Sequence, residues 1–311
     1  RDRVIEAEGL TKRYGETVAV DDLTFQVRPG IVTGFLGPNG AGKSTTMRMI
    51  LGLDAPTAGT VRIDGRPYRD LPAPLHEIGA MLEARAIHTG RSAFHHLLAM
   101  AQTHGIPRSR VGEVLDLVGL QDVAYKRFGG FSLGMGQRLG IAAALLGDPQ
   151  VLILDEPANG LDPEGILWIR TLLKDLAADG RTVFLSSHLM SEIAQTADHL
   201  IVIGRGRLIA DTTVDAVVAK ASLGAAVHVR SPQAAELAAA FKRPGVTTQL
   251  TGPDTLVVHG LSSEAIGRTA AQRSVILYEL TPQQATLEEA FMALTGDAVE
   301  FHAAGDLGAA A

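Results

Sequence analysis

The chain contains no cysteine, which excludes disulfide bonds and thiolate metal sites. Aromatic residues make up only 5% of its 311 residues. No apolar run reaches the roughly 18 residues that a membrane-spanning helix needs. The first residues, Arg1 to Glu6, lack the apolar stretch of a secretory signal peptide. We therefore expect a soluble, cytoplasmic chain that reaches a membrane only through a partner.

The chain also lacks an excess of positive charge. Asp and Glu number 34 against 28 Lys and Arg, which gives a formal net charge of −6. A mildly acidic chain is poorly suited to binding nucleic acid, so no nucleic-acid partner is expected. Hydrophobic residues make up 46%, enough for a sizeable core, and the length suits two domains of roughly 100–200 residues each.

The first predicted domain covers residues 1–222 and has an α/β pattern. Short β-rich runs near the N-terminus and around residues 60–63 predict an antiparallel edge. Other short runs are apolar and β-branched, which is typical of the buried strands of a mainly parallel sheet. These runs are Ile31–Leu36, Val151–Leu154, Thr182–Ser186 and Leu200–Ile203. Between about residues 84 and 144 the pattern becomes helical, which predicts a helical insertion into this core.

The second predicted domain covers residues 223–298, and a tail follows at 299–311. Strand-like and helix-like segments follow one another in the order βαββαβ, which favours a ferredoxin-like accessory domain. A last helix is expected at Thr286–Leu294, with Leu287, Phe291 and Leu294 on one face. We expect this domain to regulate the first or to contribute to a dimer.

The most informative motif fits G-x-x-x-x-G-K-[ST] and lies between an apolar run and a helix-like segment. Glycines let the backbone curl so that several N–H groups point at one phosphate, and the positive end of the following helix favours the same anion. The lysine would neutralise phosphate charge and the serine hydroxyl would bind Mg²⁺. The motif comprises Gly37, Pro38, Asn39, Gly40, Ala41, Gly42, Lys43, Ser44 and Thr45.

Two carboxylates follow the apolar run Val151–Leu154. Asp155 at the strand end would hold Mg²⁺ opposite Ser44. Glu156 would then act as the general base that activates the attacking water. The alternative is a solvated acidic turn after a buried strand, which the presence of the phosphate loop disfavours.

Two further positions suit phosphate chemistry. His188 ends the apolar run that starts at Val183, and an imidazole at a strand end can hydrogen-bond a phosphate. Ser132 precedes a strong helix, where a hydroxyl and backbone N–H groups form an anion site. On local evidence alone, Ser132 is more simply an N-cap of that helix.

Together these residues resemble the ATP-binding subunit of ABC transporters over about residues 5–210. The matching segments are a Walker A loop (Gly37–Thr45), a signature segment (Phe131–Met135), a Walker B strand (Val151–Glu156), a D-loop (Asn159–Asp162) and an H-loop (Ser186–His188). In that family the position of Tyr14 carries the aromatic residue that stacks on adenine, so the resemblance implies ATP as the nucleotide.

The sequence departs from the family pattern in the signature segment and at the Q-loop. Leu133 and Met135 replace a glycine and a glutamine, while Ser132 and Gly134 remain. Glu83 stands at the Q-loop position, where it is a candidate metal ligand. These departures, with the segment Thr286–Phe291, resemble the bacterial exporters of the daunorubicin- and bacitracin-resistance type.

The resemblance implies a motor subunit that binds and hydrolyses MgATP as a homodimer, with Ser132 and Gly134 of one subunit facing the nucleotide of the other. It implies a separately encoded permease, contacted by a segment near Arg85–His96, and a place on the inner face of the cell membrane. An ABC ATPase that acts on nucleic acid or ribosomes is the main alternative. A P-loop kinase or GTPase is a weaker one, because it would not need the signature, D-loop and H-loop segments together.

Overall fold

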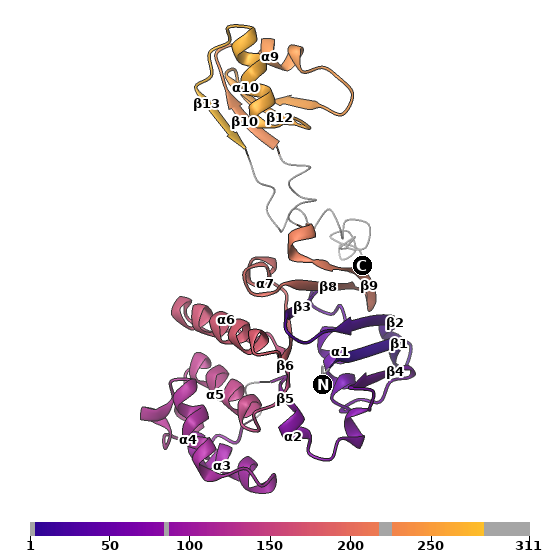
Figure 1. The fold of residues 1–311 in the computed structure, drawn as a ribbon, viewed down its shortest axis with the longest axis vertical. Coiled ribbons are helices and arrows are strands. Elements are labelled where there is room, and N and C mark those ends of the chain that lie inside the picture. The colour runs from indigo at the N-terminus through magenta and orange to yellow at the C-terminus, as the bar shows by residue number, and fades with distance from the viewer. Residues whose placement is uncertain (1–3, 84–86, 218–225, 283–311) are drawn as a thin grey trace, which may run out of the picture. The chain divides into compact units, whose positions relative to one another are not determined.

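The structure is a computed structural model and describes residues 4–83, 87–217 and 226–282. The chain folds into two compact units that separate between Thr213 and Val214. Each unit has its own sheets and helices, as the ribbon in Figure 1 shows.

The first unit contains a three-stranded antiparallel sheet. Its strands β1 (Ile5–Tyr14), β2 (Thr17–Val27) and β4 (Ala58–Ile63) are ordered β2-β1-β4. The turn between β1 and β2 contains Gly15, whose φ of +57° is strained for residues with a Cβ. Along the end of β2, buried and exposed side chains alternate, as expected for a strand with one face on the core. This sheet confirms the predicted antiparallel edge.

A second, six-stranded sheet forms the centre of the unit. Its strands are β3 (Val32–Leu36), β5 (Ile78–Met81), β6 (Val151–Asp155), β7 (Thr182–Ser187), β8 (His199–Gly204) and β9 (Arg207–Thr213). Their order is β5-β6-β7-β3-β8-β9, and every pair is parallel except β8 with β9. The predicted parallel sheet is confirmed. The sequence did not reveal its two outer strands, β5 and β9.

Helices surround this sheet. Helix α1 (Lys43–Ile50) follows β3, α6 (Pro163–Ala178) follows β6, and α7 (Met190–Thr196) follows β7. The region expected to be helical contains α3 (Ala93–Thr103), α4 (Arg108–Leu117) and α5 (Leu133–Leu145). Short elements complete the unit: α2 (Pro74–Glu77) and single 3₁₀ turns at Tyr68–Asp70, Gln121–Val123 and Phe128–Gly130.

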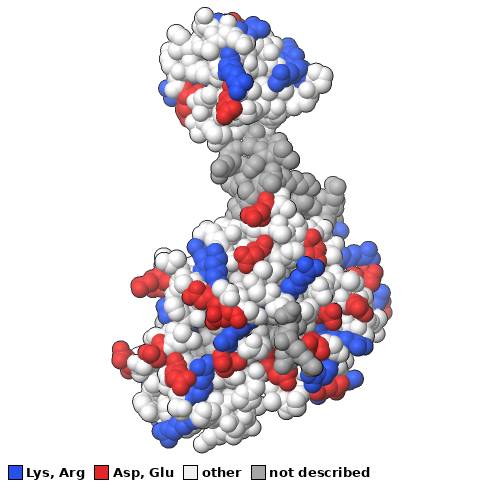
Figure 2. All heavy atoms as spheres, in the orientation of Figure 1, with Lys and Arg blue, Asp and Glu red and all other residues white. Residues whose placement is uncertain are grey.

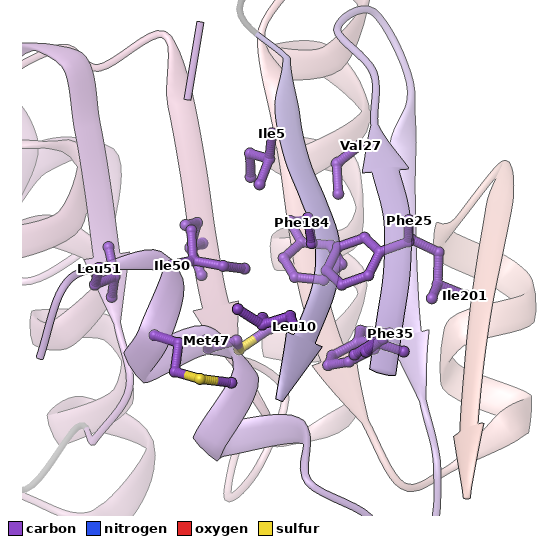
Figure 3. Packing of buried hydrophobic residues seen from close by; sticks show 14 of the residues in the cluster. Ile5, Leu10, Phe25, Val27, Phe35, Met47, Ile50, Leu51, Phe184 and Ile201 are labelled. Carbon is purple, nitrogen blue, oxygen red and sulfur yellow. The ribbon is translucent and has the colours of Figure 1, made fainter. Parts of the chain in front are cut away.

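Three phenylalanines join the two sheets. Phe25 of β2, Phe35 of β3 and Phe184 of β7 have ring centroids 5.1–5.9 Å apart, the spacing of favourable aromatic pairs. Figure 3 shows them packed with Ile5, Leu10 and the α1 residues Met47 and Ile50. The strand before the phosphate loop and the helix after it are therefore both anchored in one core.

The second unit is a small antiparallel sheet with two helices. Its elements run β10 (Ala226–Arg230), α9 (Ala234–Ala240), β11 (Thr247–Leu250), β12 (Thr255–His259), α10 (Ser263–Gln272) and β13 (Glu279–Pro282). The sheet order is β11-β12-β10-β13, and all three strand pairs are antiparallel. Alternate residues of β10 and β12, such as Val229 and Leu256, pack with Leu237 and Ile266 of the helices in a core of their own.

The last strand of this unit begins later than expected. The sequence predicted a strand at Val275–Leu280, but β13 covers Glu279–Pro282. The N–H of Ile276 donates to the Gln233 side-chain oxygen at 3.1 Å, so the chain is held by a side chain before it joins the sheet. The helix expected at 286–294, with Leu287, Phe291 and Leu294, lies outside the described residues, as does the tail at 299–311.

Candidate nucleotide-binding site

The predicted phosphate loop connects the end of β3 to the start of α1. Gly42 is the N-cap of α1 and has a φ of +104°, and a Cβ on it would lie 2.5 Å from the carbonyl oxygen of Ala19. A Cβ on Gly37 would lie 2.5 Å from the Ile203 carbonyl oxygen. Both positions therefore require glycine. Because β3 and α1 are fixed in the core, the N–H groups of the loop are preorganised for an anion.

Lys43 lies within the curl of this loop. Its Nζ donates to the Gly37 carbonyl at 2.6 Å and to the Pro38 carbonyl at 3.3 Å, and the residue is only 7% exposed. Burial lowers the pKa of Lys43, while the charges of Glu156 and Asp155 act in the opposite direction. The ammonium group is thus held near the backbone that would cradle phosphate.

Ser44 and Asp155 meet at the ends of α1 and β6. The Ser44 hydroxyl donates to Asp155 Oδ2 at 2.6 Å, and the Ser186 hydroxyl donates to Oδ1 of the same carboxylate. A hydroxyl and a carboxylate are the hard oxygen ligands that Mg²⁺ accepts, usually with phosphate and water completing the shell. Within the described ranges there is no cluster of three or more His, Asp or Glu side chains that could hold a metal alone. The pair therefore fits a cation that is shared with a phosphate.

Glu156 and His188 also meet. His188 Nδ1 lies 2.9 Å from Glu156 Oε2, which joins the end of the Walker B strand to the end of β7. Glu156 is about three-quarters buried and has a φ of +50°. The structure thus brings the two predicted catalytic residues into one hydrogen-bonded pair, beside the Ser44–Asp155 pair.

Tyr14 is held by a network that the sequence analysis did not identify. Its hydroxyl donates to Asp54 Oδ2 at 2.9 Å, and Arg48 Nε donates to the same atom at 2.7 Å. Lys12 Nζ lies 4.9 Å from the centre of the Tyr14 ring. Desolvation and Asp54 raise the pKa of the Tyr14 hydroxyl. Tyr14 is 49% exposed, so part of the residue is open to a base.

Ser132 serves as the N-cap of α5, as the simpler interpretation predicted. Its hydroxyl accepts from the Met135 N–H at 3.2 Å. The signature segment lies against the D-loop, because a Cβ on Gly134 would approach the Gly160 carbonyl oxygen at 3.0 Å. Leu133 covers Gly160, where an added Cβ would lie 2.3 Å from the leucine side chain. The two segments that the family places at a dimer interface are thus neighbours.

Glu83 follows β5, and its charge acts on Arg48, whose pKa is raised mainly by Asp54. The hydrogen bonds of Ser44 and Asp155 in the described chain do not include Glu83. Its metal role therefore remains a prediction. Of the segment expected to contact a permease, Arg85 lies outside the described residues and Arg91 is exposed.

Gln137 is a site residue that the sequence analysis missed. It is 4% exposed, and its side-chain Nε2 donates to the Glu156 carbonyl oxygen at 2.9 Å. The sequence contained a signal for this. Gln137 has the i, i+3, i+4, i+7 spacing of one helical face with Gly140, Ile141 and Ala144, which are buried on α5. A polar residue in the apolar stripe of a helix indicates a buried hydrogen bond.

Comparisons with known proteins agree with this geometry. The family model "ABC transporter" matches residues 20–159, and a model for a domain of unknown function, DUF8746, matches residues 225–288. The bacitracin transport ATP-binding protein BcrA of Bacillus licheniformis is 46% identical over 215 residues, 68% of this chain and 70% of that protein. BcrA of Enterococcus faecalis is 36% identical over 300 residues, 94% of this chain and 96% of that protein.

Solved structures show the same fold. The structure of an ATP-binding subunit of an ABC transporter has a TM-score of 0.64 and 28% identity, covering 70% of this chain and 92% of that one. A dimeric bacterial ABC transporter cassette has a TM-score of 0.62 and 26% identity, covering 68% of this chain and 98% of that one. The share of this chain that aligns with these structures is about the size of the first unit.

A phosphate loop on a buried parallel sheet, with a hydroxyl–carboxylate pair and a Glu–His pair beside it, defines a P-loop ATPase. The chain belongs to the ABC transporter family, in which it is the ATP-binding motor subunit of an exporter that hydrolyses ATP for transport. Its α/β core is followed by a small antiparallel-sheet domain. None of the helices in the described part of the chain is both long and apolar enough to cross a membrane.

Proposed function

We propose that this subunit works as a MgATP-driven homodimer on a separately encoded permease and exports an antibiotic. The observation that carries the chemistry is the convergence of two pairs at one sheet end: Ser44 with Asp155 at 2.6 Å and Glu156 with His188 at 2.9 Å. A phosphate group, a cation and an attacking water all need to be held in such a place.

Each residue has a role in this proposal. The N–H groups of the loop Gly37–Thr45 bind the phosphates, and Lys43 neutralises their charge. Ser44 and Asp155 hold Mg²⁺, which when bound offsets negative charge between the outer phosphates. Glu156 accepts a proton from the attacking water, and His188 orients that carboxylate through its Nδ1. Tyr14 stacks on adenine, and Glu83 is an additional metal ligand.

The assembly is proposed from the family and its relatives. A related bacterial cassette has been solved as a dimer. In a dimer of this chain, Ser132 and Gly134 face the nucleotide of the other subunit. The permease then contacts the region that includes Arg91 and places the motor on the inner face of the cell membrane.

The cargo is inferred from relatives that align with this chain over most of their length. Two are named for bacitracin transport, and one of Streptococcus pyogenes is named for lantibiotic transport. The alternative is an ATPase that acts on ribosomes or nucleic acid. The negative net charge of the chain disfavours it. Over the described residues visible in Figure 2, acidic and basic side chains are interspersed, without a broad basic face.

We further propose that residues 223–298 form a ferredoxin-like accessory domain, separate from an ATP-binding domain at 1–222. The sheet order β11-β12-β10-β13, with a helix after the first and third strands, supports this arrangement. The compact units, which part between Thr213 and Val214, support a boundary in this region.

The chemical part is tested by replacing Glu156. The Glu156→Gln variant should bind ATP with an affinity near that of the original chain and hydrolyse it at least about 10²-fold more slowly, since a general base is worth that much. ATP affinity, steady-state hydrolysis and dimer mass would be measured. Glu236→Gln, the same change on the exposed face of α9, is the control. Near-normal turnover by Glu156→Gln would remove Glu156 from the role.

The transport part is tested in a bacitracin-sensitive host. Production of this chain together with a candidate permease should raise resistance, and production of the Glu156→Gln chain with the same permease should not. Co-purification of the chain with ribosomes or RNA instead of a membrane protein would favour the alternative function.

A further inference from the structure

We propose that Gln137 is a positioning residue for Glu156. Its buried amide holds the Glu156 peptide in the conformation that directs the carboxylate to the nucleotide, and it links that peptide to α5, the helix capped by Ser132. This inference rests on the proposed role of Glu156 as general base. Gln137 itself touches neither the phosphate loop nor the Glu156 carboxylate through its hydrogen bond.

The backbone of Glu156 needs such support. Its φ of +50° lies in the left-handed region, which costs a residue with a Cβ roughly 1–3 kcal/mol and persists only where neighbours determine it. Its N–H donates toward the Ser186 carbonyl at 3.3 Å and the Ser186 hydroxyl at 3.1 Å. Its carbonyl accepts from the Asn159 N–H at 3.1 Å and from Gln137 at 2.9 Å. Of these two donors to the Glu156 carbonyl, Asn159 belongs to the turn after β6, whereas Gln137 belongs to a separate helix.

Gln137 is itself fixed. It is 4% exposed on α5, between the buried residues Gly136 and Leu139. An amide in such surroundings is costly unless it is hydrogen-bonded, so the bond constrains the glutamine as well as the glutamate. Removing the donor would leave the Glu156 carbonyl with the Asn159 N–H alone and free the peptide to rotate.

The same helix carries the residues proposed to face the other subunit. Ser132 caps α5, and Gln137 lies five residues along it, a rise of about 7.5 Å. Because an α-helix is stiff over that distance, a shift of its N-terminus carries Gln137 with it. The geometry points to a direct route by which contact at Ser132 adjusts the angle of the Glu156 carboxylate in the same subunit.

Gln137→Leu in the full chain is the first test. It should leave the affinity for a non-hydrolysable ATP analogue within about twofold and lower kcat by roughly tenfold, the worth of one buried hydrogen bond. Gln102→Leu makes the same change at an exposed position of α3 and should leave kcat unchanged. An unchanged kcat in a folded Gln137→Leu protein, or an equal loss of affinity and kcat, would overturn the proposal.

Gln137→Glu separates positioning from general loss of packing. The carboxylate keeps the shape of the amide but has no proton to donate until it is protonated, which burial favours. Its kcat deficit, taken relative to the original chain at each pH, should therefore shrink as the pH falls from about 8 to about 6. A deficit that does not depend on pH would indicate a packing defect and count against the proposal.

A double variant separates this inference from the role of Glu156. If Gln137 acts through the Glu156 carboxylate, Gln137→Leu should cause no further loss of kcat in the Glu156→Gln background. A full additional tenfold loss there would show that Gln137 acts in another way. If Glu156→Gln alone turns over normally, the proposed base is wrong, whatever the Gln137 variants do.

Discussion

Tyr14 owes its position to residues on another segment of the chain. Asp54 accepts hydrogen bonds from both Tyr14 and Arg48, so the aromatic ring is fixed before any nucleotide arrives. Preorganisation of this kind saves the entropy of ordering a side chain on binding. The residues that determine affinity thus extend beyond those that would touch the base.

We expect Tyr14→Ala to weaken ATP binding by about tenfold or more, since stacking on a base is worth about 1–3 kcal/mol. It should also reduce the preference for ATP over GTP. Titration with fluorescent ATP and GTP analogues measures both effects. Unchanged affinity and preference would remove Tyr14 from the adenine site.

Asp54→Ala should weaken ATP binding less than Tyr14→Ala, by a few-fold, because the ring stays but is no longer fixed. In the double variant the two effects should not add, since both act through one ring. The matched control is Asp70→Ala, which removes an exposed carboxylate from the neighbouring 3₁₀ turn. Additive losses would mean that Asp54 acts independently of Tyr14.

At this scale the sequence predicted the residues that belong to linear motifs. Lys43, Ser44, Asp155, Glu156 and His188 all lie at the same sheet end, as expected from strands that finish together. Asp54 and Gln137 were not predicted, because each acts on a residue that is distant in sequence. Only the folded chain brings Asp54 to Tyr14 and Gln137 to Glu156.

Among the elements, β5 and α5 approach each other closely. A Cβ on Gly79 would lie 2.0 Å from the Ala144 carbonyl oxygen, a backbone atom that cannot move aside. Gly79→Ala should therefore destabilise the first unit by about 1–3 kcal/mol, the usual cost of overpacking. Thermal unfolding would measure this. Gly112→Ala on α4, where an added Cβ meets nothing within 4 Å, should instead raise the stability by about 0.5–1 kcal/mol.

Helix α3 contains a histidine, His96, that makes the stability of the fold depend on pH. Burial, with a smaller effect of Arg91, lowers the pKa of His96 below its usual 6.5. In the range just below pH 6.5 the unfolded chain then binds more protons than the folded one, so stability is lost as the pH falls and kept above that range. His96→Gln should reduce the fall in Tm between about pH 6.5 and about pH 5. His104→Gln, which removes an exposed histidine, is the control, and equal slopes in both variants would contradict the prediction.

The elements themselves were predictable where a periodic pattern was strong. The buried strands β3, β6, β7 and β8 were located to within a few residues. Strand β9 was missed because it is an edge strand with no fully buried residue, and its apolar run, Leu208 to Ala210, is short. Strand β13 was misplaced because Val275 is buried without being in the sheet.

For the whole molecule, separate cores predict separate unfolding. The phenylalanine cluster stabilises the first unit and the β10–β12 cluster the second, and no buried residue among those described belongs to both clusters. Calorimetry should show two transitions. ATP at about 100 times its Kd should stabilise one of them by about 2.7 kcal/mol and leave the other in place. A single transition that ATP shifts as a whole would contradict this independence.

The first and last described strands of the second unit lie side by side. Strand β10 opens that unit and β13 is the last strand described, yet the two are neighbours, and Val227 at the start of one pairs with Pro282 at the end of the other. Paired residues in antiparallel strands have their α-carbons only about 4.5–5.5 Å apart. A segment whose ends meet can be cut out, replaced by a short turn or exchanged for another domain without stretching the rest of the chain. The described segment 226–282 meets this condition, so we expect that a chimaera can exchange it for another domain with a splice at this pair.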